Sequence, residues 1–259
     1  MDVAQDMLER RINNYAERSF RDMADGDYIT ARLACRSGLL SQFQWSAQQA
    51  IEKYLKYILL VNRIPAKNVN HDIRAALELA KKLPFKIDLY KRSQRFIQHI
   101  AEYGEYRYLD RSYFVVGHAL VELDVAIWDL RRYAQVLDAS RRELPIEEQE
   151  LIAKAWEALR ESGNKPPQKF RLHGGFLERI LDNKEHPARK ALIWQNACFG
   201  SRVRRRVLAT SYMDAQNAPL YLYPDMLDEL NKYVHIPSKL REGYRQHLEA
   251  IKRDPSKRP

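Results

Sequence analysis

An arginine and a histidine lie seven positions apart in the stretch RYLDRSYFVVGH, residues 107–118, at Arg111 and His118. An imidazole titrates near neutral pH and can move a proton, and a guanidinium can stabilise negative charge that develops at phosphorus. Metal-independent RNA cleavage needs both groups, one at the 2′-hydroxyl or the leaving oxygen and one at the transition state. The structural alternative is a hydrogen-bonded core histidine, because His118 lies among valines.

The spacing of the pair depends on the helix expected to carry it. Asp110 is a suitable helix N-cap, and the pattern predicts a helix from there to about residue 138. On that helix Arg111 lies in the first turn, whose free N–H groups favour a phosphate, and His118 lies ~10 Å further along the same face. Three other pairs have a similar spacing: Arg92/His99, Arg179/His186 and Arg241/His247. Only the position in the fold therefore distinguishes Arg111 and His118.

Two other stretches carry groups that suit RNA. The segment SRVRRRVLATSY, residues 201–212, contains Arg202, Arg204, Arg205 and Arg206 next to aromatic residues. Arginines interleaved with aromatics can clamp phosphates and stack on bases, although a solvated helix face has the same composition. The segment EYGEYRY, residues 102–108, ends in Arg107 and Tyr108, which could contact RNA or lie in a dimer interface.

The charge is positive and unevenly distributed. The chain of 259 residues has 44 Lys and Arg against 34 Asp and Glu, a net charge of +10. By the printed sequence, residues 1–140 hold 21 basic and 18 acidic residues (+3) and residues 141–259 hold 23 and 16 (+7). Basic surfaces attract polyanions, so the charge favours nucleic acid as a partner.

Several functional classes have no support in the sequence. Cys35 and Cys198 are far apart, which argues against a disulfide framework and a cysteine zinc site. No His, Asp and Glu cluster has metal-ligand spacing, and no phosphate-loop, dinucleotide-binding or nucleophile-elbow motif is present. We expect no metal or cofactor. The acidic start and the short apolar runs predict a cytoplasmic protein without membrane contact.

The dominant residues are strong helix formers, which predicts an all-α protein. Helical spacing covers 28–62, as one long helix or an antiparallel pair that breaks near 41–46, and further helices are expected at about 71–83, 86–105 and 146–162. Asp72 is expected to cap the helix that begins after it, with His71 packed beside it, rather than to form a metal or proton relay. Helices are also expected in PDMLDELNKYV and PSKLREGYRQHLEAIKR. The predicted organisation is a bundle over 1–140, a basic helical region over 141–252 and a disordered tail over 253–259.

Residues 20–137 resemble a HEPN domain, the helical unit named for higher eukaryotes and prokaryotes nucleotide-binding. The resemblance is carried by AQQAIEKYLK at 47–56, by NHDIRAALE at 70–78 and by the Arg111–His118 segment. Ser112 stands where the family often has Asn, Asp or His after the arginine. The region 141–259 resembles no family that we can name.

The resemblance implies a helical bundle of four or five helices, usually a homodimer that brings two Arg–His motifs together. Many members are metal-independent ribonucleases, often toxins or phage-defence effectors, and others bind nucleotides, RNA or a small nucleotidyltransferase. It assigns proton transfer to His118, charge stabilisation to Arg111 and orientation to Ser112. An antitoxin or a nucleotidyltransferase is the partner protein that it implies.

The sequence leaves two main hypotheses. The first is an endoribonuclease that uses Arg111 and His118, with substrate held by Arg107, Tyr108 and the arginines at 202–206. The second is a module without catalysis that binds RNA, a nucleotide or a protein on the same surfaces. An exposed His118 favours the first, and a buried His118 favours a purely structural role.

Overall fold

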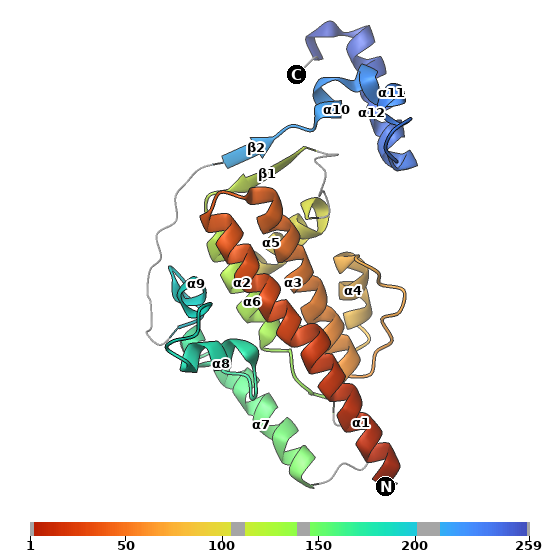
Figure 1. Cartoon of the computed structure of the whole chain (residues 1–259). Helices are drawn as coiled ribbons and strands as arrows, with labels where there is room; N and C mark the ends of the chain where they lie inside the picture. The colour runs from red at the N-terminus through yellow and green to blue at the C-terminus, as the bar shows by residue number, and fades with distance from the viewer. Residues whose placement is uncertain (1–2, 105–111, 139–145, 201–212, 258–259) are drawn as a thin grey trace. The chain divides into compact units, whose positions relative to one another are not determined.

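Most of the polypeptide is helical, which confirms the all-α interpretation. The computed structural model describes residues 3–104, 112–138, 146–200 and 213–257 (Figure 1). Contacts divide the chain into two compact units, one of residues 1–105 and 118–210 and the other of residues 106–117 and 211–259. We call them the bundle unit and the small unit. Among the described residues, no helix has both the length and the apolar character needed to cross a membrane.

The bundle unit is built on five helices, which in chain order are α1 (Val3–Ala16), α2 (Asp22–Arg36), α3 (Leu40–Val61), α5 (Lys91–Tyr103) and α6 (Ala119–Arg131). The helices α2, α3, α5 and α6 lie side by side in Figure 1, and α1 continues the line of α2. A π-helical turn, Glu17–Arg21, joins α1 to α2 without a break. The core contains fully buried apolar side chains from α3 and α6, including Ile51, Leu55, Ile58, Leu123 and Ile127.

The turn between α2 and α3 is set by a glycine. Gly38 has a φ of +72°, which L side chains adopt only with strain. The N–H of Gly38 donates to the carbonyl of Cys35, and the N–H of Leu39 donates to that of Ala34, the two bonds of a Schellman motif. The segment 28–62 is therefore part of two helices, and the break lies at 37–39 rather than at the predicted 41–46.

Four further helices complete the described part of this unit. They are α4 (Ile73–Ala80), α7 (Ile146–Ser162), α8 (Phe176–Asp182) and α9 (Arg189–Ile193). The bounds of α7 are those expected from the sequence. Residues 146–200 belong to the bundle unit, which differs from the predicted division at residue 140. The boundary segment itself, residues 139–145, lies outside the described residues.

The small unit contains the only two strands among the described residues. Strand β1 (Tyr113–Val116) pairs antiparallel with β2 (Met213–Gln216), with Tyr113 opposite Gln216. After β2 come α10 (Pro219–Leu222), α11 (Leu227–Leu230) and α12 (Ser238–Arg253). Their apolar core includes Leu220, Leu227, Ile236, Leu240 and Tyr244. The tail predicted as disordered includes the end of α12 and a 3-10 turn over Pro255–Lys257.

A fully buried arginine joins three helices of the bundle unit. The Arg131 guanidinium on α6 donates to both oxygens of Asp25 on α2, at 3.0 and 3.1 Å, and to both oxygens of Glu178 on α8, at 2.9 Å each. The backbone N–H of Leu177 also donates to Asp25, and that of Leu172 donates to Glu178. Each charge is thus compensated inside the protein, as burial requires.

A second buried arginine repeats the arrangement nearer the start of α6. Arg32 on α2 pairs with Asp124 on α6, and its Nε donates to the carbonyl of Ala191 on α9 at 3.0 Å. Tyr28 donates to Asp124 at 2.6 Å, and Asn196 donates to the Tyr28 hydroxyl at 2.8 Å. Both arginines therefore connect α2 and α6 to residues beyond 170.

Replacing Glu178 tests how much stability this network carries. Burial favours the neutral acid, but Arg131 and the Leu172 N–H outweigh it and lower the pKa of Glu178 from 4.5 to about 2. The ionised carboxylate therefore stabilises the fold above pH 4.5, and that contribution is lost as the pH falls towards 2. Glu178→Gln should lower the free energy of unfolding by about 3 kcal/mol at pH 7.

The measurement is urea unfolding between pH 7 and pH 2.5, with the exposed Glu185→Gln as the control. Glu178→Gln should also show a flatter pH dependence below pH 5 than the wild type. Equal stability of the two variants at pH 7 would contradict a structural role for the network.

Candidate active site

The stretch before His118 is a strand rather than the expected helix. Residues 113–116 form β1, and α6 begins only at Ala119. Tyr, Phe and two valines favour a pleated conformation, and β2 satisfies their backbone groups. The helix predicted from Asp110 is therefore wrong over this stretch, and so is the placement of Arg111 and His118 on one helical face.

His118 is an exposed residue at the start of α6. It is the N-cap of the helix, and its own side chain makes no capping hydrogen bond. Its carbonyl accepts the hydrogen bond from Glu122 N that closes the first turn, and 46% of its side chain is exposed. The histidine is thus not a core side chain, despite its apolar neighbours in the sequence.

One carboxylate orients the imidazole. Glu122 lies one turn along α6, with Oε1 at 3.2 Å from Nε2 of His118. The same oxygen lies 3.6 Å from Nε of Arg92 on α5. Glu122 is 21% exposed and Arg92 is 42% exposed, so the carboxylate is the most sheltered of the three groups. We call Arg92, His118 and Glu122 the α5–α6 cluster.

This cluster combines groups that can act on a phosphodiester. With Nε2 held by Glu122, the Nδ1 atom of His118 has no partner among the described residues and can exchange a proton with a ligand. Arg92 adds a cation that is always charged, and the uncapped first turn of α6 offers backbone N–H groups beside the imidazole. A base, an orienting carboxylate and a cation meet the geometric needs of acid–base catalysis.

Most of the other predicted site residues cannot be placed. Those outside the described residues are Arg107, Tyr108, Arg111, Arg202, Arg204, Arg205 and Arg206. Ser112 is described and belongs to the small unit, whereas His118 belongs to the bundle unit. The Ser112 hydroxyl accepts a hydrogen bond from Ala218 N at 3.0 Å, which ties the start of β1 to the residue before α10. Through this hydrogen bond, Ser112 has a structural role in the small unit.

Asp72 has the capping role expected of it, whereas His71 is not packed beside it. The Asp72 carboxylate accepts hydrogen bonds from the N–H groups of Arg74 and Ala75, which confirms it as the cap of α4. His71 is exposed and pairs with Glu52 at 3.1 Å. Within the described ranges, no three His, Cys, Asp or Glu side chains gather where they could hold a metal ion.

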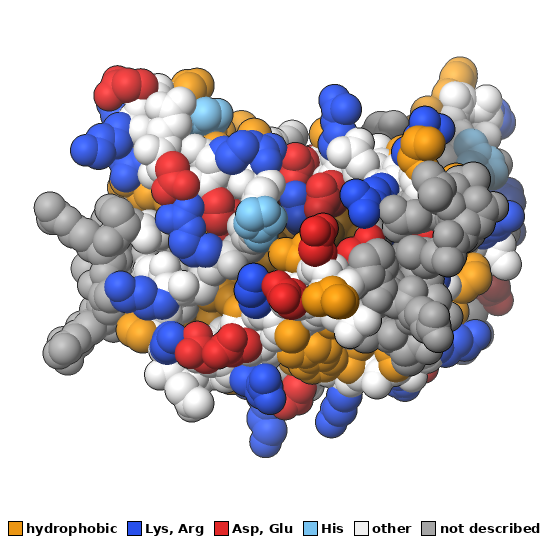
Figure 2. Space-filling view, turned by 90° about the horizontal axis from the view of Figure 1, so that it is seen from below, with side chains coloured by type: hydrophobic (Ala, Val, Ile, Leu, Met, Phe, Trp, Pro, Cys, Tyr) orange, Lys and Arg blue, Asp and Glu red, His pale blue; other side chains and the backbone are white. Residues whose placement is uncertain are grey.

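The distribution of surface charge is mixed on the face shown in Figure 2. Blue basic and red acidic side chains alternate there, and they do not gather into one basic patch. An extended RNA footprint therefore has no support on this face.

The comparison with known families matches the bundle helices. Residues 17–126, from the π-helical turn into α6, match the sequence model of the HEPN domain. These residues form a HEPN domain. The HEPN family includes ribonucleases and nucleotide-binding modules, and HEPN domains often dimerise and bind RNA. All three residues of the α5–α6 cluster lie within the HEPN match. No curated protein and no solved structure matches the chain.

Sequence reasoning missed two members of the cluster. Glu122 lies four residues after His118, a spacing that places two side chains on one helical face, and this signal was available once α6 was expected. Arg92 comes from another helix of the HEPN domain. Its approach to Glu122 depends on how α5 packs on α6, and local sequence patterns do not predict this packing.

The exposure of His118 leads to a stability prediction. His118→Ala should change the free energy of unfolding by less than about 0.5 kcal/mol, because a surface residue with one exposed ion pair contributes little. Chemical unfolding of the variant beside the wild type measures this. A loss of about 2 kcal/mol or more would show that the imidazole is a packing element.

Proposed function

We propose that this HEPN domain is a metal-independent endoribonuclease in which His118 transfers the proton. The observation that carries the proposal is the exposed His118 imidazole, which Glu122 holds by one nitrogen while the other is open to a ligand. The family includes ribonucleases, and the residue lies inside the family match.

The chemistry is an internal transesterification. The imidazole takes the proton of the ribose 2′-hydroxyl as O2′ attacks phosphorus, and the bond to the 5′-oxygen of the next nucleotide breaks. The leaving oxygen takes a proton from water, and the imidazolium returns its proton to the solvent, so the products end in a 2′,3′-cyclic phosphate and a 5′-hydroxyl. No metal ion is consumed or required in this step.

Negative charge on the phosphoryl oxygens needs cations near His118. Arg92 is the described candidate, because it shares the Glu122 carboxylate with His118. Arg111 is the second, as the family resemblance assigns, and Ser112 is proposed to assist it. Arg107, Tyr108 and the arginines at 202, 204, 205 and 206 are proposed to hold the RNA.

The biological setting that we propose is that of a toxin or phage-defence effector in the cytoplasm. An antitoxin or a nucleotidyltransferase would then be its protein partner. The alternative is a HEPN module that binds RNA, a nucleotide or a protein without cleaving. The exposed, carboxylate-bound histidine favours cleavage, because binding alone does not need an oriented imidazole.

Single-site variants test the catalytic assignment. With RNA in EDTA, His118→Ala should lower the cleavage rate by about 10²–10⁴-fold, the usual contribution of a general acid–base group. Glu122→Gln should lower it by about fivefold, because it weakens the hold on the ring by about 1 kcal/mol. Arg92→Ala should also slow cleavage. The assay measures cutting of 5′-labelled RNA and identifies the cyclic phosphate.

Two variants serve as matched controls. His173→Ala removes an exposed histidine from a loop, and Arg95→Ala removes an exposed arginine one turn from Arg92. Both should cut like the wild type. An inert wild type, or a His118→Ala variant that cuts normally, would reject the ribonuclease and leave the binding module.

Mixing two inactive variants tests whether the site is shared across a homodimer. If Arg111 of one protomer serves His118 of its partner, a mixture of Arg111→Ala and His118→Ala chains regains one intact site in each heterodimer. Random exchange then restores about a quarter of the wild-type activity. Sedimentation should show dimers, and a mixture that stays inactive although heterodimers form would contradict the shared site.

A further inference from the structure

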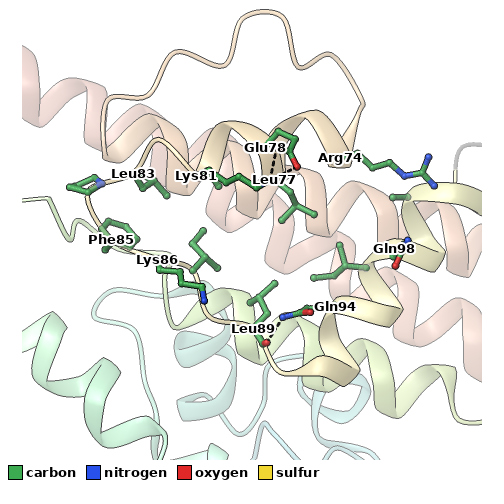
Figure 3. A pocket seen from close by; sticks show the side chains of 15 residues that line it. Arg74, Leu77, Glu78, Lys81, Leu83, Phe85, Lys86, Leu89, Gln94 and Gln98 are labelled. Atoms are coloured by element: carbon green, nitrogen blue, oxygen red, sulfur yellow. Dashed lines mark hydrogen bonds and ion pairs between the residues drawn. The ribbon is translucent and has the colours of Figure 1, made fainter.

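The HEPN domain contains a large pocket away from the α5–α6 cluster. It lies between α4, α5 and the segment 81–89 that joins them, and its volume is about 920 Å³ (Figure 3). All of its lining residues belong to the bundle unit. Pockets of about 300–1,000 Å³ are typical of sites for small molecules.

The floor of the pocket is apolar. It is formed by one stripe of α4, by the apolar residues of the joining segment and by one stripe of α5. The main apolar contributors are Leu77, Leu83, Phe85, Ile87, Leu89 and Ile97. Such a floor would hold the hydrocarbon or aromatic part of a ligand.

The rim is positively charged. Arg74, Lys81 and Lys86 line the pocket, and Glu78 is the one acidic residue among its lining side chains. Glu78 pairs with Lys81 at 2.7 Å, so their charges cancel. Arg74 pairs with Glu102 at 3.9 Å, whereas Lys86 has no ion-pair partner among the described residues. Lys86 is therefore the cation that the rim offers to a ligand.

The walls are fixed before any ligand binds. The N–H of Asp88 donates to the Tyr133 hydroxyl at 3.0 Å, and the N–H of Tyr90 donates to Asp129 at 2.7 Å. Phe85 stacks on Tyr133 with ring centres 6.5 Å apart. These contacts tie the joining segment to residues 129 and 133, at and after the end of α6. A preformed pocket lowers the cost of binding, because little has to be ordered.

We propose that this pocket binds a small amphipathic anion, with an apolar body on the floor and an acidic group at Lys86. The volume suits one ligand of drug-like or medium-chain size, and the unpaired charge of Lys86 on the rim selects a negative head group. A neutral ligand would leave Lys86 without a partner, and a cationic ligand would be repelled.

The ligand would not cover the α5–α6 cluster. The pocket uses Gln94, Ile97, Gln98 and Ala101 of α5, which have the i, i+3, i+4, i+7 spacing of one helical face. Arg92 precedes this stripe and projects from another side of α5, where it meets Glu122. Binding at the pocket is thus independent of the proposed RNA cleavage.

Competition between matched amphiphiles tests the proposal. The probe is 8-anilinonaphthalene-1-sulfonate, an aromatic sulfonate whose fluorescence rises in an apolar site. Below their micellar concentrations, decanoate, decanol and decyltrimethylammonium share a ten-carbon chain and differ in charge. We expect saturable binding of one probe per chain, and displacement by decanoate at about a tenfold lower concentration than by decanol. The cation should not displace the probe. Equal displacement by all three would overturn the proposal.

Three variants test whether the ligand binds in this pocket. Lys86→Glu should weaken decanoate binding about tenfold or more, because it replaces attraction by repulsion. Lys67→Glu makes the same change in net charge at an exposed lysine outside the pocket and should have no effect. Ala101→Phe should fill the pocket and abolish probe binding while the helical circular dichroism is retained. Equal loss in both lysine variants, or full binding by Ala101→Phe, would reject this pocket as the site. RNA cleavage by the variants reports separately on the nuclease.

Discussion

The buried guanidinium of Arg131 is the constraint on which the arrangement of the HEPN domain depends. A charge that is fully removed from water is tolerated only when opposite charges and hydrogen bonds surround it. Asp25 and Glu178 supply both, and the ring of Phe199 lies 5.6 Å from the guanidinium carbon. Because each partner comes from a different segment, α6 cannot shift or rotate without leaving an uncompensated charge.

Arg32 and Asp124 apply the same constraint nearer to the His118 end of α6. Asp124 lies two residues after Glu122, on the buried side of the helix. Since Asp124 is fixed towards α2, Glu122 faces α5, and there it meets Arg92 and holds His118. The geometry of an exposed site is thus determined by charges in the interior. The first turn of α6 carries both the proposed chemistry and its support.

The sequence predicted the parts of this structure that local patterns determine. Helical periodicity predicts the bounds of α7, and the preference of aspartate for N-caps predicts the role of Asp72. Periodicity did not predict the conformation of residues 113–116, because a short apolar run such as Tyr-Phe-Val-Val fits a buried helix or a strand equally well. The partner strand that decides between them comes about a hundred residues later in the chain. The buried arginines gave no signal either, since a charged residue in a helix normally faces water. The pocket between α4 and α5 is likewise a product of tertiary packing.

The buried contacts that residues 131–196 make with the matched region limit how this chain can be recombined. The HEPN match ends at residue 126, yet Asp25 and Arg32 inside it find partners at Arg131, Ala191 and Trp194. A gene rearrangement that kept the matched region and exchanged the residues C-terminal to it would leave the buried Asp25 carboxylate without its cation. We therefore expect the matched region and residues 127–200 to evolve together, because recombination between them would destabilise the fold. Surface residues of 127–200 can vary, whereas Glu178 has to change together with Arg131.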